Sequence, residues 1–155
     1  MAWHPFDLDH RAHKIVLNAR QRDNDSLNQA YKMRATCAYG LERFWGEHLR
    51  LRENESAKAD FVKDTWKAFR EIMRDCRPDL VIPEEVLSKQ CTEDYIRAEA
   101  NKFWLISTTD QQECLTLLVA LCDSIVWWTQ RLKLKSKTRR TEDSDTIAAA
   151  EVNHE

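Results

Sequence analysis

Glycine and proline are scarce in this chain, and their scarcity restricts the fold more than any other feature. Glycine occurs twice and proline three times among 155 residues. Tight hairpin turns depend on residues that reach positive φ or that fix φ in advance, so a sheet protein needs many more of them. Alanine, leucine, glutamate, lysine and arginine, which favour helix, are abundant instead. We therefore expect an all-α protein.

Apolar residues recur at helical spacing in six segments, which polar or proline-containing stretches separate. They predict helices over about residues 8–22, 27–52, 57–76, 84–90, 93–106 and 109–135. The fifth helix is expected to be capped by Thr92 and to bury Trp104, and the last to begin with the capping box Thr109-x-x-Gln112. The last segment is apolar around most of its circumference, which predicts a central position. The sequence thus predicts a single bundle of five to six helices over residues 1–135.

The composition becomes polar from Ser136, and we expect residues 136–155 to form a disordered tail. The tail is basic up to Arg140, and its last 15 residues carry five carboxylates and neither lysine nor arginine. The whole chain has a formal charge of −2, whereas residues 1–140 alone have a charge of +3. Because the body and the tail differ in sign, the overall charge is a poor guide to partners.

The cysteines and the apolar segments indicate a reducing compartment. None of the five cysteines forms a C-x-x-C pair, so neither a zinc site nor a redox motif is predicted. Four lie in apolar helical segments and are interpreted as buried thiols: Cys37, Cys76, Cys114 and Cys122. The N-terminal residues lack a secretion-signal pattern, and the longest apolar segment, residues 115–128, is too short and mixed for a bilayer. We expect a cytoplasmic protein without a membrane partner.

The segment "FVKDTWKAFREIMRDCRP", residues 61–78, separates its side chains into three stripes when it is wound as a helix. One stripe is apolar. A narrow edge beside it is acidic and consists of Asp60, Asp64, Glu71 and Asp75. A third stripe, the basic ladder, steps by 4, 3, 4 and 3 residues and consists of Lys63, Lys67, Arg70, Arg74 and Arg77. A surface helix needs only a mixed polar face, so the separation of the two signs requires an explanation.

A basic ladder about 20 Å long can follow the regularly spaced phosphates of a nucleic acid. Trp66 lies at the border of the ladder and can stack on a base if it is exposed. The alternative is that the charges pair with one another along the helix, because Asp60 and Lys63 are helical neighbours. We interpret the ladder residues as phosphate contacts, with that structural alternative left open.

A second basic feature, "RLKLKSKTRR", covers residues 131–140 at the end of the last predicted helix. Six of its ten residues are lysine or arginine, and Arg131, Lys133 and Lys135 are interpreted as further phosphate contacts. The alternative is a solubilising C-terminal turn. Neither basic feature predicts recognition of a base sequence.

Two further sequence patterns are considered as a metal site and as a ribonuclease site. "HPFDLDHRAH" places His4, His10 and His13 near aspartates, but no third ligand is indicated on another element, so no metal is expected. Arg43 and His48 have the R-x4-H spacing and resemble the motif of helical HEPN ribonucleases, in which Arg and His act on the scissile phosphate. No phosphate-binding glycine loop or nucleophile motif occurs. We expect no catalytic residue and no cofactor, and keep the ribonuclease as an alternative.

Three segments resemble the small helical subunit of class 1 CRISPR effector complexes, especially the type III kind. They are "YGLERFW" at 39–45, "FVKDTWKAFREIM" at 61–73, and "ECLTLLVALCDSIVWWTQRLK" at 113–133 with its Trp128-x-x-Arg131 ending. The likeness covers Leu27 to Leu132, and the chain departs from it in the "RPDLVIP" loop and in the acidic tail.

The resemblance implies a non-catalytic subunit of a ribonucleoprotein for antiviral defence. Such subunits line the complex in several copies and contact the backbone of guide and target strands through lysine and arginine. The implied partners are RNA or single-stranded DNA, other subunits of the complex, and further copies of the chain. A helical protein-interaction module without a nucleic-acid role remains the second alternative.

Overall fold

The computed structural model describes residues 5–134, and every regular element in that range is helical. The α-helices are α1 (Leu8–Arg22), α2 (Gln29–Thr36), α3 (Leu41–Leu51), α4 (Ser56–Cys76), α5 (Glu93–Asn101) and α6 (Thr108–Leu132). Short 3-10 helices join them: η1 (Pro5–Asp7), η2 (Asn24–Asn28), η3 (Cys37–Tyr39), η4 (Ser88–Gln90) and η5 (Lys102–Leu105). The all-α prediction is confirmed. The predicted tail, residues 136–155, lies outside the described residues.

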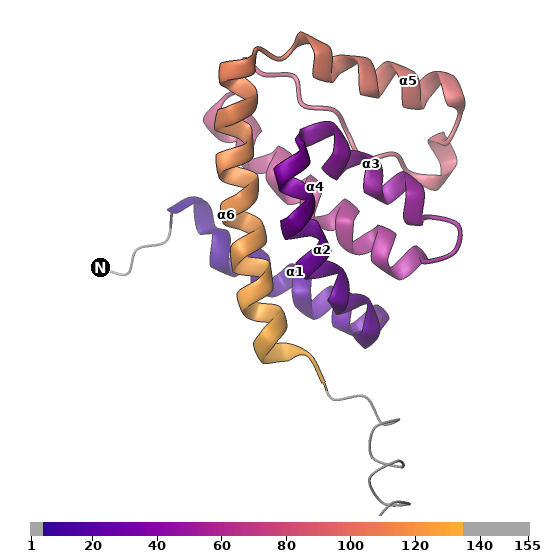
Figure 1. Cartoon of the computed structure of the whole chain (residues 1–155), viewed down its shortest axis with the longest axis vertical. Coiled ribbons are helices and arrows are strands. Elements are labelled where there is room, and N and C mark those ends of the chain that lie inside the picture. Colours follow the sequence, from indigo (N-terminus) through magenta and orange to yellow (C-terminus); the bar gives the residue numbers. More distant parts are fainter. Residues whose placement is uncertain (1–4, 135–155) are drawn as a thin grey trace, which may run out of the picture.

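The long helix α6 runs along one side of the bundle and contacts α1, α2 and α4, while α5 lies across one end (Figure 1). Helix α1 is antiparallel to α4, because Arg11 pairs with Glu71 and Arg22 with Asp64. Helix α6 buries Cys114, Leu118, Leu121 and Ile125 completely on one face, but Trp127 on another face is 45% exposed. The predicted central position is therefore wrong, because α6 is covered by the bundle on one side only. The apolar stripes of α1 and α4 face the same interior.

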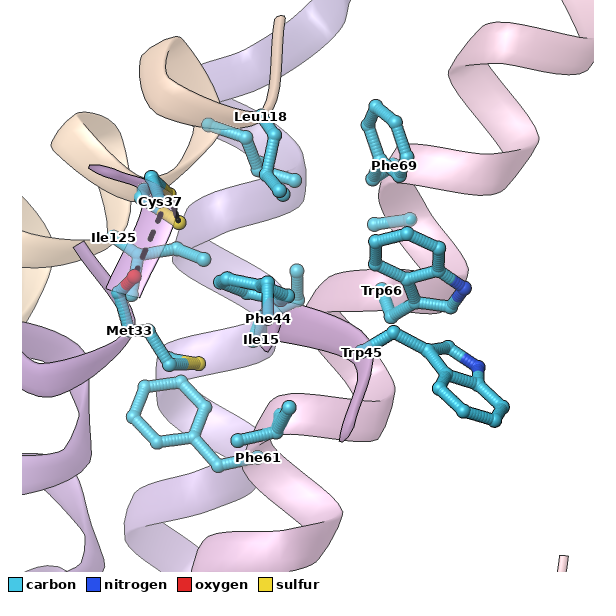
Figure 2. Close-up of a cluster of buried hydrophobic side chains, with 14 of the residues drawn as sticks. Ile15, Met33, Cys37, Phe44, Trp45, Phe61, Trp66, Phe69, Leu118 and Ile125 are labelled. Carbon is cyan, nitrogen blue, oxygen red and sulfur yellow. Dashed lines mark hydrogen bonds between the residues drawn. The ribbon is translucent and has the colours of Figure 1, made fainter. Parts of the chain in front are cut away.

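Aromatic rings fill the interior between α3, α4 and η5. The Trp66 ring lies 6.0 Å from Phe44, 5.0 Å from Phe69 and 5.9 Å from Phe103, measured between centroids. Figure 2 shows Phe44, Trp66 and Phe69 as one group of packed rings. Trp66 and Phe69 have no exposed surface. Burying such rings stabilises the fold by about 1.5–3 kcal/mol each, so this group is a main source of stability.

The helix expected over residues 27–52 is broken into η2, α2, η3 and α3, so that prediction is wrong. The break lies at Gly40, whose φ of 105° and ψ of 170° no helix has. Side chains are strained at that φ, and glycine adopts it readily because it has no Cβ. The second glycine, Gly46, stays inside α3.

The predictions for the second half need three further corrections. Only Ser88–Gln90 is helical within the expected helix 84–90. Trp104 is 68% exposed rather than buried, because the chain tightens from α5 into η5 and turns this side chain outward. Ser107 caps α6 by accepting a hydrogen bond from the Asp110 amide, so the capping box at Thr109 does not form. Thr92 caps α5 as expected.

The five cysteines are free thiols. Cys37, Cys114 and Cys122 are buried as expected, whereas Cys76, at the last position of α4, is exposed. None of the helices within residues 5–134 combines the length and the apolar character that crossing a bilayer requires.

Candidate nucleic-acid interface

The basic ladder of α4 is divided between internal ion pairs and solvent. Lys63 lies 3.3 Å from Asp60, Arg70 lies 3.0 Å from Glu85, and Arg77 lies 2.8 Å from Asp79. Lys67 and Arg74 are exposed and have no carboxylate within ion-pair distance among residues 5–134. The structure therefore leaves two of the five ladder cations available to a polyanion.

Arg70 fastens a segment that has no regular structure, residues 83–86, to the bundle. Its guanidinium contacts Glu85, and Glu84 lies 3.7 Å away. The side chains of Arg70 and Glu85 are only 21% and 11% exposed, so water competes weakly with this pair. The position of Arg70 is thus explained by the segment that it holds.

Four other side chains hold the same segment. The Trp45 and Trp66 indoles donate to the carbonyls of Glu84 and Pro83 at 2.8 and 2.7 Å. The Glu99 carboxylate accepts from the Glu84 amide at 2.8 Å, and His48 accepts from the Val86 amide. Buried backbone groups of a loop need such partners, because no helix or sheet supplies them.

Arg77 joins the end of α4 to the beginning of α6. Its guanidinium contacts Asp79, Asp110 at 3.2 Å and Glu113 at 2.6 Å. These carboxylates raise the pKa of Arg77, chiefly through the hydrogen bond with Asp79. Three carboxylates of its own chain thus surround this predicted phosphate contact.

Trp66 cannot stack on a base. Its side chain has no exposed surface, and its indole N–H donates to the Pro83 carbonyl. The condition for stacking, an exposed Trp66, is therefore not met, because the segment 83–86 covers this part of α4. Figure 2 shows its ring directed into the group that includes Phe69 and Phe44.

Two of the four acids on the acidic edge of α4, Glu71 and Asp64, contact α1 of the same chain. Glu71 accepts a hydrogen bond from Arg11 at 3.0 Å, and Asp64 accepts two from Arg22 at 2.8 and 2.9 Å. The two signs of charge are therefore separated on α4 because its two polar edges meet different neighbours. Part of the acidic edge meets arginines of α1, and part of the basic edge meets carboxylates that follow α4.

A shallow hollow of about 250 Å³ lies where α1 and α4 meet, and we call it the α1–α4 groove. Its polar lining consists of Arg11, Lys14, Asn18, Asp64, Lys67 and Glu71. Both acids are bound by arginines, so the two lysines remain uncompensated within the described part of the chain. The Arg11 Nε atom is also buried there without a hydrogen-bond partner among residues 5–134. The groove thus combines two free ammonium groups with an unused donor.

The second basic feature is only partly described. Arg131 turns back along α6, where its guanidinium lies 3.5 Å from the centre of the Trp127 ring and donates to the Trp127 carbonyl. Lys133 donates to the Asn28 side chain. Both side chains remain accessible, but neither shares a groove with Lys67. Lys135 lies outside the described residues.

The ribonuclease pair is not brought together. Arg43 is exposed, whereas His48 is 1% exposed. The His48 Nδ1–H donates to the Trp45 carbonyl, and Nε2 accepts from the Val86 amide at 3.0 Å, so both ring nitrogens are used. Burial lowers the pKa of this imidazole, which is neutral in this arrangement. His48 therefore fastens residues 83–86 and cannot reach a phosphate.

The histidines of the N-terminal segment do not form a metal site within residues 5–134, where no three suitable side chains gather. His10 lies 3.0 Å from Asp7, whose carboxylate binds this side chain and leaves the first amides of α1 uncapped. The His13 ring packs on Trp128 at 4.5 Å between centroids. His4 lies outside the described residues.

Lys14 lines the α1–α4 groove, although the sequence did not indicate it as a candidate site residue. Its position on the polar side of α1 follows from helical spacing, but its place beside Lys67 depends on how α1 packs on α4. No family model, curated protein or solved structure matches this chain.

Proposed function

We propose that this domain is a non-catalytic subunit that binds the backbone of RNA or single-stranded DNA at the α1–α4 groove. The observation that carries the proposal is that Lys14 and Lys67, from two different helices, line one groove whose acids are already paired. Arg74 continues the same stripe of α4 as an exposed cation. Such lysines act as point charges that replace condensed counterions along phosphates.

The wider role comes from the resemblance to class 1 CRISPR small subunits. On that basis we assign the domain to a cytoplasmic ribonucleoprotein, with other protein subunits and further copies of the chain as partners. The free state of all five cysteines supports a reducing location. Arg131 and Lys133 then extend the contact as secondary sites, whereas Lys63, Arg70 and Arg77 contribute through the fold.

The proposal predicts that reversing the charge of the groove weakens binding of a fluorescent single strand. The double variant Lys14→Glu, Lys67→Glu should lose at least about tenfold in affinity at low salt, because two phosphate contacts become repulsive. The slope of log affinity against log salt should fall by roughly 1.4, since each single-strand contact contributes about 0.7. Fluorescence anisotropy over a salt series measures both quantities.

The matched control is Lys32→Glu, Lys89→Glu, which changes the formal charge equally at exposed positions outside the groove. The control variant should retain most of the wild-type affinity, and its salt slope should fall less than that of the groove variant. Equal losses in the two double variants would show general charge attraction and would contradict a groove-centred site. Thermal unfolding of all proteins checks that the substitutions leave the fold intact.

A second candidate function, a protein-interaction module, is favoured by two adjacent apolar side chains on η5. Trp104 is 68% exposed and Leu105 is 86% exposed, although both belong to residue types that usually bury their surface. This candidate predicts no binding of any single strand at low salt. If the anisotropy of fluorescent RNA and DNA strands stays unchanged when the wild-type protein is added, this candidate is favoured over the first proposal.

A further inference from the structure

Two buried thiols from different helices meet at the contact between η3 and α6. The Cys37 Sγ lies 3.8 Å from the Cys122 Sγ, although the residues are 85 positions apart in the chain. Cys37 is 3% exposed and Cys122 has no exposed surface. The Cys37 thiol also donates to the Met33 carbonyl at 3.4 Å, one turn earlier (Figure 2). No part of the proposed nucleic-acid interface uses this pair.

The surroundings shift the pKa values of the two thiols in opposite directions. The contact with Cys122 lowers the pKa of Cys37, and the charge of Arg34 lowers it further. The same contact and burial raise the pKa of Cys122. Arg34 is held at 2.6 Å by Asp123, so one ion pair already joins α2 to α6 beside the sulfur atoms. Cys37 is therefore the better nucleophile of the two.

We propose that Cys37 and Cys122 are a dithiol that a hydroperoxide converts into a disulfide linking η3 to α6. The Cys37 thiolate attacks one peroxide oxygen, the O–O bond breaks, and a sulfenic acid and one hydroxide form. The Cys122 sulfur then attacks the sulfenic sulfur, an S–S bond forms, and water leaves. In sum, two thiols are oxidised, and one hydrogen peroxide is reduced to two waters.

The geometry requires only a small movement. The sulfur atoms must close from 3.8 Å to about 2.05 Å, which side-chain rotation on neighbouring elements can provide. Both thiols are buried, so the oxidant must first reach them, and this step limits the rate of oxidation. Opening of η3 next to the conformational break at Gly40 supplies it without unfolding α6.

The other cysteines serve as internal comparisons. Cys114 is fully buried, and burial raises its pKa to about 11, so it is a poor nucleophile. Cys76 is exposed and Cys91 is half-buried, and neither lies within 4 Å of another sulfur among the described residues. Simple exposure would select Cys76 for oxidation, whereas proximity selects the pair Cys37 and Cys122.

The test treats the full chain with hydrogen peroxide, alkylates the remaining thiols under denaturing conditions, and measures intact and tryptic masses. We expect an oxidised species that carries alkyl groups on three of its five cysteines, whereas protein treated with dithiothreitol before alkylation carries five. Trypsin places Cys37 in the peptide 35–43 but leaves Cys114 and Cys122 together in 103–131. The variant Cys114→Ser, or fragmentation of the linked wild-type peptide, therefore identifies the second sulfur.

The oxidised protein should also unfold several degrees higher than the reduced one, because a link over 85 positions restricts the unfolded chain. Cys76→Ser should form the link as wild type does, and Cys122→Ser should not. The proposal is overturned if Cys37 and Cys122 both remain alkylatable while Cys76 becomes oxidised. It is equally overturned if the wild-type linked peptide contains Cys114 instead of Cys122.

Discussion

His48 connects α3 to the segment 83–86 through both nitrogens of its ring. Its two ring nitrogens bind the Trp45 carbonyl and the Val86 amide, an arrangement that only one neutral tautomer satisfies. A protonated ring would place an N–H against the Val86 N–H. The folded state therefore disfavours protonation of the His48 imidazole, in agreement with the lowered pKa that burial causes.

This exclusion predicts a pH-dependent stability. The folded-state pKa of His48 lies below the unfolded value of about 6.5, so the unfolded chain takes up the proton first. The stabilisation is fully present above about pH 6.5 and is lost as the pH falls, by at most about 1.4 kcal/mol per unit. Urea unfolding between about pH 7.5 and pH 5.5 measures this loss.

The variant His48→Gln keeps a donor and an acceptor but does not titrate. We expect it to be less stable than wild type by about 1–3 kcal/mol at neutral pH and to lose less stability on acidification. His10→Gln, at an exposed position outside this contact, controls for the general effect of removing an imidazole. Parallel pH curves for wild type and His48→Gln would contradict a neutral His48 in the folded state.

At the scale of elements, the polar edges of α4 show how packing uses a charge pattern. Its acidic edge binds Arg11 and Arg22 of α1, and Arg70 and Arg77 bind carboxylates that follow α4. An isolated helix with the same sequence would pair its charges along its own surface. The charge pattern is therefore explained largely by the neighbours of α4, and within residues 5–134 only Lys67 and Arg74 of the basic ladder lack a carboxylate partner.

The two glycines provide a prediction about the break between η3 and α3. Gly40→Ala should destabilise the fold by about 1–3 kcal/mol, because its φ of 105° strains any residue with a Cβ. Gly46→Ala should stabilise it by up to about 1 kcal/mol, since this position is helical and a Cβ there meets no atom within 4 Å. Urea unfolding of both variants measures the difference. Equal effects of the two substitutions would show that the break does not depend on Gly40.

Helices α1, α4 and α6 could be predicted from the sequence because their apolar spacing is a local signal. The break at Gly40 could not be placed, since a glycine inside a helical pattern is compatible with both a helix and a kink. The burial of Trp66 depends on Pro83, which is 17 positions away and in a segment without periodicity. Likewise, the meeting of Lys14 with Lys67 depends on packing between helices. Local patterns thus predicted the elements and the charged residues, but not which charges remain free.

At the scale of the whole molecule, the sign of the charge changes along the chain. The formal charge is −2 overall but +3 without residues 141–155, which contain five carboxylates and no lysine or arginine. These residues lie outside the described part of the chain, and the sequence itself gives their charge and their covalent link to the basic body. Carboxylates tethered to a basic body compete with phosphates for its free cations and lower the local potential.

Removal of residues 141–155 should therefore tighten the binding of a single strand, by roughly three- to tenfold at about 50 mM salt. The difference should shrink at about 200 mM salt, because screening weakens the competition. A full-length variant with Asn and Gln in place of the five acids separates charge from length and should bind like the truncated chain. Fluorescence anisotropy at both salt concentrations measures these affinities. If the neutralised tail instead left the wild-type affinity unchanged, the acids would not compete for the cations, and the groove would act independently of the tail.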